Sequence, residues 1–338
     1  MERSNLFCPP NYHNKMTIRQ TTVAIKQIKD LFERELAEAL NLTRVSAPLF
    51  VLSTLGLNDN LSGGERPVTF DVAGIDYRHV EIVHSLAKWK RTALKRYGFY
   101  MHEGLYTDMN AIRRDEVLDN LHSIYVDQWD WELIIEKAER NENTLKNIVQ
   151  KIYQVFKKTE QYLQQQYPVL TKKLPSDITF ITSEELLQMY PNQTPKEREN
   201  LITKKHGAVF LMQIGDRLSN EKPHDGRAPD YDDWQLNGDI LFWYEPLNCA
   251  FEVSSMGIRV DEEALMYQLT KADALDRSGL PYHQDLLKGK FPYTVGGGIG
   301  QSRICMFFLN KAHIGEVQAA IWPEEMMKKC EEHQMFLL

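Results

Sequence analysis

A glycine-rich stretch that precedes an arginine and an apolar run is the segment of this 338-residue chain best suited to chemistry. Four of the five residues from 296 to 300 are glycines, which lack the Cβ atoms that keep a backbone away from a ligand. The apolar run 304–309 predicts a buried helix with Arg303 in its first turn. A guanidinium beside a helix N-terminus can bind a phosphate or a carboxylate through two contacts. A tight turn with a surface arginine is the alternative interpretation.

Two further arginines and two acids lie in or beside segments that the sequence predicts as strands. Arg113 and Arg259 each end such a segment, and arginines at sheet ends can converge on one polyanion. Asp239 and Glu252 belong to otherwise apolar runs, where a buried carboxylate is costly unless a cation or a donor meets it. Beside a triphosphate, these two carboxylates would hold Mg²⁺. Surface ion pairs and outward-facing acids are the alternatives.

Composition favours a globular enzyme and argues against other classes. Hydrophobic residues make up 43% of the chain and charged residues 26%, enough for a sizeable core. The net charge of −7 argues against nucleic-acid binding, which requires clustered Lys and Arg. No apolar run approaches the roughly 20 residues of a transmembrane helix, so no membrane contact is expected. The four cysteines show no CxxC spacing, which indicates reduced thiols and a cytoplasmic location.

The elements that must position these residues follow from periodicity. Thr17 can cap a long amphipathic helix that runs to Leu40, and an edge strand around Pro48 follows within 42–51. Helix and edge strand together are a candidate dimer interface. Since no repeat or change of composition divides the chain, we expect a flexible arm at 1–15 and a single mixed α/β domain at 16–338.

Alternating and helical patterns predict the other elements. The predicted helices cover 87–97, 143–166, 262–275 and 281–287, with two short ones that begin at Ser183 as a cap and at Pro195. The predicted strands cover 67–72, 81–85, 109–113, 121–129, 178–181, 208–214, 239–244 and 250–260, and loops dominate from 97 to 106. Both faces of the strand at 121–129 mix polar and apolar residues, as the floor of a ligand site requires.

Five strings in this order resemble ammonia-dependent asparagine synthetase, also called aspartate–ammonia ligase. They are 84–91 (HSLAKWKR), 125–131 (YVDQWDW), 227–234 (RAPDYDDW), 254–260 (SSMGIRV) and the glycine-rich stretch. The resemblance covers about 15–322. It implies a catalytic core similar to class II aminoacyl-tRNA synthetases, with a mostly antiparallel sheet flanked by helices. It also implies that the helix and strand at 17–50 are motif 1 at a homodimer interface, that 112–116 is motif 2, and that the glycine-rich stretch with Arg303 is motif 3.

The same resemblance implies a two-step reaction. The β-carboxylate of aspartate attacks the α-phosphate of ATP to form β-aspartyl-AMP and pyrophosphate, and ammonia then displaces AMP. Arg113 is expected to bind the α-phosphate and Arg303 the γ-phosphate. Asp239 and Glu252 are expected to hold Mg²⁺. The remaining residues expected at the ATP are Glu116, Gly298 and Gly300.

For the aspartate pocket, the resemblance implies two cations, two acids and neutral donors. Either Asp59 or Asp130 is expected to bind the substrate ammonium, and Lys90 and Arg259 its carboxylates. Gln128, Ser254 and Ser255 complete the expected pocket, and Asp232 is a candidate metal or ammonia-side group. From spacing alone, a turn-forming role for Asp59 is the favoured interpretation. No histidine stands out as the base that deprotonates ammonium, since a hydrogen-bonded structural role for His84 and His122 is at least as well supported.

Free ammonia is the expected nitrogen donor, because the sequence shows no cysteine positioned for an N-terminal glutaminase and no room for a second domain. Two other functions remain open. An aspartyl- or asparaginyl-tRNA synthetase-like paralogue would share the adenylation residues but normally carries an anticodon-binding barrel, for which no N-terminal run of strands is present. A non-catalytic regulatory paralogue would be expected to lose the arginines that bind phosphate, and Arg113 and Arg303 are both present.

Overall fold

The computed structural model describes residues 6–59 and 65–338. Its main sheet contains β1 (Leu42–Arg44), β5 (Gly104–Ile112), β6 (Tyr125–Ile134), β7 (Thr179–Thr182), β8 (Ala208–Met212), β9 (Asp232–Tyr244), β10 (Cys249–Arg259) and β11 (Thr294–Gly300). The strand order is β1-β5-β6-β11-β10-β9-β8-β7, and only the outer pairs β1–β5 and β7–β8 are parallel. The predicted mixed α/β class with a mostly antiparallel sheet is confirmed.

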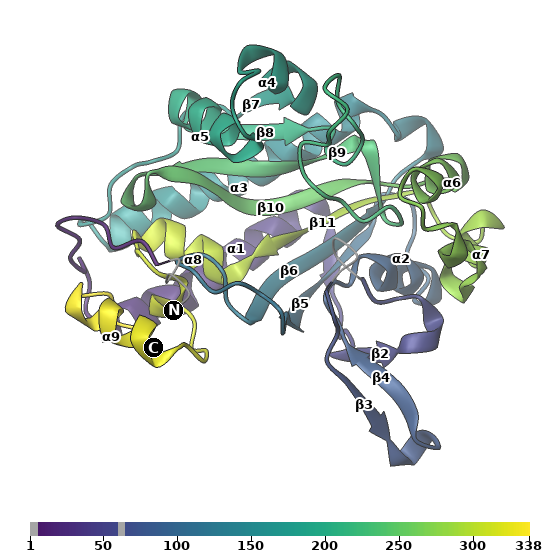
Figure 1. Cartoon of the computed structure of the whole chain (residues 1–338), viewed down its shortest axis with the longest axis horizontal. Coiled ribbons are helices and arrows are strands. Elements are labelled where there is room, and N and C mark those ends of the chain that lie inside the picture. The colour runs from purple at the N-terminus through teal and green to yellow at the C-terminus, as the bar shows by residue number, and fades with distance from the viewer. Residues whose placement is uncertain (1–5, 60–64) are drawn as a thin grey trace.

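Helices cover the sheet on its rear face in the view of Figure 1, where α1 and α3 lie behind the strands. The helices are α1 (Ile18–Leu40), α2 (Ala87–Arg96), α3 (Glu142–Gln166), α4 (Ser183–Met189), α5 (Pro195–His206), α6 (Glu262–Lys271), α7 (Pro281–Leu287), α8 (Gln301–Leu309) and α9 (Glu324–Glu332). The fully buried Phe32 of α1 stacks on Trp129 of β6, with ring centroids 5.0 Å apart, and meets Phe156 of α3 edge-on. These aromatic rings hold the rear layer against the sheet and leave the opposite face for a site.

A second, three-stranded sheet projects from the body below α2 in Figure 1. It has the order β2-β4-β3 and consists of β2 (Phe50–Leu52), β3 (Thr69–Val72) and β4 (Arg78–Ile82). The single strand predicted for 42–51 is therefore wrong, because its two halves belong to different sheets. Pro48 lies in the connection between them, where its missing N–H breaks no sheet hydrogen bond.

Other predicted boundaries also shift. The glycine-rich stretch, for which no strand was predicted, is strand β11, which pairs with β10 on one side and with β6 on the other. The loop expected to extend to 106 ends earlier, because β5 begins at Gly104. The cap of α4 is Thr182, whose side chain accepts from the backbone N–H of Glu185, and not Ser183. Pairing with neighbouring strands explains β11 and the early start of β5, because such pairing can extend a strand beyond the residues whose local pattern predicts one.

Residues 6–16, which form most of the predicted N-terminal arm, lie against the C-terminal part of the chain. Tyr12 and Asn14 both donate to the carboxylate of Glu316, and the backbone of Phe7 exchanges hydrogen bonds with Asn120. Residues 1–5 of that arm lie outside the described part of the chain. Within 6–59 and 65–338, no helix has both the length and the apolar character needed to cross a membrane.

Candidate active site

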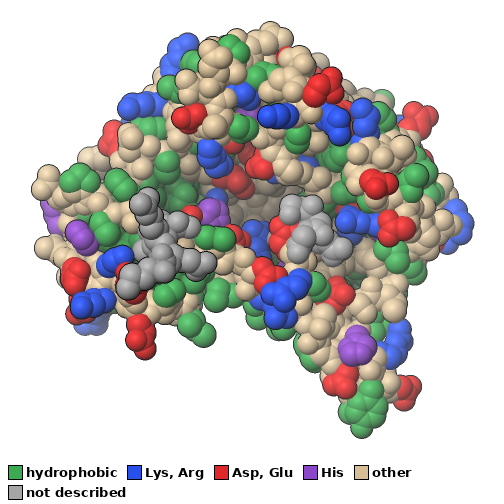
Figure 2. All heavy atoms as spheres, viewed as in Figure 1, with side chains coloured by type: hydrophobic (Ala, Val, Ile, Leu, Met, Phe, Trp, Pro, Cys, Tyr) green, Lys and Arg blue, Asp and Glu red, His purple; other side chains and the backbone are tan. Residues whose placement is uncertain are grey.

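A cavity of about 310 Å³ opens on the face of the sheet opposite α1 and α3. Figure 2 shows this face hollowed at its centre, with acidic and basic side chains around the hollow. The cavity brings together thirteen of the predicted site residues and the candidate Asp232. These thirteen are Asp59, Lys90, Arg113, Glu116, Gln128, Asp130, Glu252, Ser254, Ser255, Arg259, Gly298, Gly300 and Arg303. Asp239 is the one predicted residue that does not line it, and it lies behind the lining residue Arg227.

The glycines of β11 make room for polar side chains on its neighbour β6. Gly296, Gly298 and Gly300 stand opposite Glu132, Asp130 and Gln128, respectively, in the antiparallel register. A Cβ on Gly298 would lie 2.6 Å from the Gln128 side-chain oxygen and 3.0 Å from Asp130 Oδ1. Any larger residue would therefore displace side chains that line the cavity.

Lys90 of α2 lies in the floor of the cavity and is almost completely buried. Its Nζ donates to the carbonyl of Gly297 at 2.9 Å and lies 3.2 Å from Asp130 Oδ2 and 3.9 Å from Glu132 Oε2. Burial lowers the pKa of Lys90, and Arg259 lowers it further, while the two carboxylates oppose both effects. The charge of this ammonium group therefore depends on its acidic neighbours.

Arg259, at the end of β10, is equally buried and is held by two carboxylates. Its Nε donates to Glu132 Oε1 at 3.0 Å and its Nη2 to Glu132 Oε2 at 2.7 Å, while Nη1 pairs with Asp232. Burial acts to raise the pKa of Glu132, but Arg259 and Lys90 bring it below the ordinary value. Glu132 was not among the predicted site residues. Its place two residues after Asp130 on the same face of β6 is the signal that identifies it.

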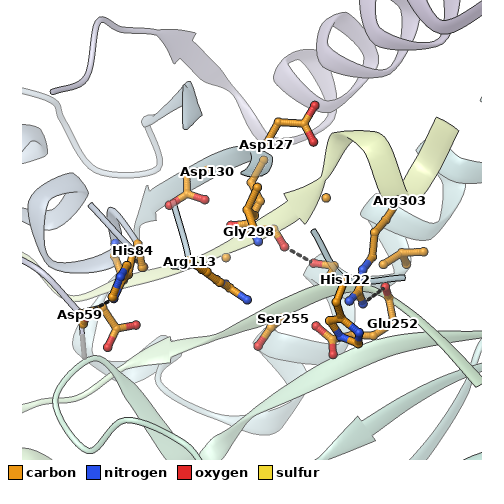
Figure 3. A pocket seen from close by; sticks show the side chains of 18 of the residues that line it. Asp59, His84, Arg113, His122, Asp127, Asp130, Glu252, Ser255, Gly298 and Arg303 are labelled. Carbon is orange, nitrogen blue, oxygen red and sulfur yellow. Dashed lines mark hydrogen bonds between the residues drawn. The ribbon is translucent and has the colours of Figure 1, made fainter. Parts of the chain in front are cut away.

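Asp59 lies at the end of the cavity that also holds His84, as Figure 3 shows. Its side chain is 1% exposed, its backbone N–H donates to the side chain of Asn58, and its carbonyl oxygen lies 3.0 Å from His84 Nδ1. A solvated turn residue would be exposed. The burial of Asp59 therefore fits a ligand-binding acid better than the turn interpretation.

Arg303 lies on the side of the cavity away from His84, and Arg113 lies between them (Figure 3). Arg113 follows β5, and its Nη1 lies 3.9 Å from Glu116. Arg303 is in the first turn of α8, as predicted, and its Nη1 donates to the backbone carbonyl of Glu252 at 3.0 Å. Burial would raise the pKa of Glu252, yet Arg303 and other cations nearby lower it. The cations around Glu252 therefore make this part of the cavity suited to a polyanion.

Asp127 fixes the start of α8. Its Oδ1 accepts from the backbone N–H of Ser302 at 3.1 Å, and its Oδ2 accepts from Lys29 of α1 at 2.9 Å. A carboxylate at a helix N-terminus is stabilised by the helix dipole. Asp127 was not among the predicted site residues. Asp127 connects the rear helix α1 to the helix that carries Arg303.

The two predicted magnesium ligands differ in their surroundings. Asp239 forms an ion pair with Arg227, which was also not among the predicted site residues. Burial raises the pKa of Asp239 to about 6 although Arg227 opposes this. Asp239 Oδ1 is buried and has no hydrogen-bond partner among the described residues. Residues 6–59 and 65–338 contain no group of three or more His, Cys, Asp or Glu arranged to hold a metal. A pair of carboxylates fits Mg²⁺ when phosphate oxygens and water complete its coordination.

Comparison with known proteins agrees over nearly the whole chain. The model of a family described as aspartate-ammonia ligase matches residues 19–334. The aspartate–ammonia ligase of Ruminiclostridium cellulolyticum is 64% identical over 335 residues, which cover 99% of this chain and 100% of that protein. The aspartate–ammonia ligase of Lactobacillus johnsonii is 61% identical, over 98% of this chain and 99% of its own length.

Among solved structures, similarity extends to asparaginyl-tRNA synthetases. The enzyme of Pyrococcus horikoshii complexed with asparaginyl-adenylate has a TM-score of 0.64 at 15% identity, over 90% of this chain and 71% of that one. The enzyme of Entamoeba histolytica in complex with asparaginyl-adenylate has a TM-score of 0.62 at 15% identity, over 89% of this chain and 66% of that one. At this identity the likeness concerns the fold, and it confirms the predicted class II synthetase architecture.

Proposed function

Because this chain belongs to the aspartate–ammonia ligase family and is a ligase of asparagine biosynthesis, we propose that it makes L-asparagine from L-aspartate, ATP and ammonia through β-aspartyl-AMP. The observation that carries this proposal is one cavity with two different sets of charged groups. Lys90, Arg259, Asp130 and Asp59 supply both signs of charge, as an amino acid requires, and Arg113 and Arg303, which both act on Glu252, supply cations for phosphates. Such a cavity places a carboxylate beside a nucleotide phosphate.

In the first step, the set with both signs of charge orients aspartate so that its β-carboxylate faces the α-phosphate. Lys90 and Arg259 bind the α-carboxylate, and Asp59 or Asp130 binds the ammonium. Arg113 stabilises the charge that develops on the α-phosphate as the acyl–phosphate bond forms and pyrophosphate leaves. Arg303 binds the γ-phosphate from the first turn of α8, where the helix dipole adds to its charge.

In the second step, ammonia attacks the activated β-carbonyl carbon. The new C–N bond forms, the C–O bond to the phosphate breaks, AMP leaves, and the nitrogen releases one proton to solvent. Gln128, Ser254 and Ser255 line the middle of the cavity and supply neutral donors that orient the acyl group without competing for its charge. Asp232, which is held against Arg259, stays a candidate for the ammonia side.

Mg²⁺ bound by Asp239 and Glu252 would neutralise phosphate charge and favour the departure of pyrophosphate. In the structure, the Asp239 carboxylate forms an ion pair with the guanidinium of Arg227.

Helix α1 and the segment that follows it to residue 50 are proposed to form a homodimer interface. Support comes from apolar side chains that the single chain leaves exposed, since Ile18 is 53% and Leu49 is 49% exposed.

A cytoplasmic location is proposed from the cysteines, which form no disulfide in the described part of the chain.

One assay tests the activity. Purified protein incubated with aspartate, ATP, Mg²⁺ and an ammonium salt is expected to release asparagine, AMP and pyrophosphate in equal amounts. Replacement of ammonium by glutamine is expected to abolish product. Formation of ADP would refute the adenylate, and charging of tRNA with aspartate or asparagine would instead support the synthetase-like alternative.

A further inference from the structure

We propose that Glu132 is a positioning residue, the shared counter-ion that keeps Lys90 and Arg259 charged and oriented as a pair for the α-carboxylate of the amino-acid substrate. This inference rests on the proposed function and concerns a residue outside the cavity lining.

Both oxygens of the Glu132 carboxylate accept hydrogen bonds from neighbouring side chains. Oε1 accepts from Arg259 Nε at 3.0 Å and from the Thr294 hydroxyl at 2.7 Å. Oε2 accepts from Arg259 Nη2 at 2.7 Å and lies 3.9 Å from Lys90 Nζ. The side chain is completely buried. A buried carboxylate with this many donors is fixed in one orientation, and it fixes those donors in turn.

Electrostatics explains why both cations need this residue. Lys90 and Arg259 are buried side by side, so each disfavours the charge of the other, and burial disfavours both charges. Since a guanidinium keeps its proton, Lys90 is the member of the pair that would become neutral. The charged groups that face Lys90 are Asp130 and Glu132 from β6 and Arg259 from β10, and the carbonyl of Gly297 faces it from β11.

The sheet is built around this carboxylate. Gly296 of β11 stands opposite Glu132, and a Cβ at position 296 would collide with Glu132 Oε2 and lie 2.6 Å from Arg259 Nη2. A Cβ would also lie 2.6 Å from the backbone carbonyl oxygen of Trp131, so the ion pair and the adjacent strand together require this glycine, and a turn does not, because its φ is not positive. One face of strand β6 thus supplies Gln128 and Asp130, which line the cavity, and Glu132, which orients Lys90 and Arg259.

The test compares Glu132→Gln with the wild type by steady-state kinetics. Loss of the negative charge is expected to raise the KM for aspartate by roughly tenfold or more and to leave the KM for ATP nearly unchanged. The KM for aspartate of the variant is also expected to rise as pH increases through the neutral to alkaline range, because Lys90 then loses its proton. The wild type is expected to show a weaker dependence on pH over that range.

Two further variants keep the test decisive. Thr294→Val removes a single hydrogen bond to Glu132 Oε1 and is expected to raise the KM for aspartate in the same direction by a smaller factor. Glu160→Gln is the matched control. Glu160 is a buried glutamate of α3 that accepts only backbone N–H groups, from Lys173 and Leu174, so its loss is expected to lower stability without changing either KM.

Equal effects of Glu132→Gln on aspartate and ATP, or a pH profile parallel to that of the wild type, would refute the positioning role. If Glu132→Gln does not fold, Thr294→Val decides by the same two measurements. A wild-type protein that makes no asparagine would instead refute the proposed function.

Discussion

Arg303 Nη1 donates a hydrogen bond to the backbone carbonyl of Glu252 at 3.0 Å, so the first turn of α8 is joined to β10. The guanidinium also lies 6.0 Å from the ring centroid of Phe251. The arginine predicted to bind the γ-phosphate is thus placed beside one of the two predicted magnesium ligands before any nucleotide binds.

Replacement of Arg303 tests the cations proposed to bind phosphates. Arg303→Ala is expected to lower kcat/KM for ATP roughly 100-fold or more, because a preorganised cation is lost. The kcat/KM of Arg303→Lys for ATP is expected to lie between those of the wild type and Arg303→Ala, since an ammonium keeps the charge but not the forked geometry. Arg96→Ala, at an exposed arginine of α2, is the control. Full activity of Arg303→Ala would contradict the assigned role.

The two carboxylates Asp239 and Glu252 are expected to make ATP binding dependent on Mg²⁺. Calorimetric titration of the wild type with ATP should show affinity that falls sharply when EDTA removes the metal. In Asp239→Asn and Glu252→Gln, the affinity with Mg²⁺ is expected to approach that measured without it. Asp71→Asn, on the exposed strand β3, provides a matched loss of charge away from the cavity. Variants that keep the full effect of Mg²⁺ would argue for other ligands.

The glycines of β11 are expected to be intolerant of side chains. A Cβ on Gly297 would lie 2.7 Å from the carbonyl oxygen of Ser255, a backbone atom that cannot move independently of β10. Gly297→Ala is therefore expected to lower the free energy of unfolding by roughly 1–3 kcal/mol in urea denaturation. Gly74→Ala has open space around its added Cβ and is expected to change it by less than about 0.5 kcal/mol. Similar losses in both variants would contradict the close-packing argument.

His313 is expected to make stability depend on pH. Burial lowers its pKa to about 4, and its Nδ1 accepts from the backbone N–H of Gly315, which requires the unprotonated nitrogen. The unfolded chain, with a pKa near 6.5, takes up the proton first as pH falls, so this contribution is complete above about pH 6.5 and is lost toward about pH 4.

Between about pH 7 and about pH 5, the wild type should lose about 2 kcal/mol more free energy of unfolding than His313→Asn, whose amide oxygen can replace Nδ1 as acceptor. Urea denaturation at both pH values measures the difference. Equal losses in the two proteins would show that His313 does not cause the dependence.

The proposed homodimer interface is tested by placing charge on its exposed apolar residues. Ile18→Glu combined with Leu49→Glu is expected to convert a dimer into a monomer in size-exclusion chromatography with light scattering, because a desolvated carboxylate opposes association. Met189→Glu, on a similarly exposed residue of α4, should leave the mass unchanged. A wild type that is already monomeric would refute the interface.

The sequence by itself determined the composition of the site. The types and order of its motifs identified the family, and thirteen of fourteen predicted residues line one cavity. Helical periodicity also located α1, α2 and α3 closely, because the pattern of a helix is contained within a few consecutive turns. The long segments for which local pattern and tertiary packing agree were therefore predicted correctly.

Only the tertiary structure decided which charges meet. Glu132 binds Arg259, which lies 127 residues away in the sequence. Arg227 precedes strand β9 and binds Asp239 within it. The spacing of these residues in the sequence therefore predicted neither ion pair. Pairing across strands likewise turned the glycine-rich stretch into β11, since its hydrogen-bond partners on β6 and β10 are remote in sequence. A buried charge is stabilised by whichever opposite charge the sheet places beside it, and register, which depends on all the strands together, makes that choice.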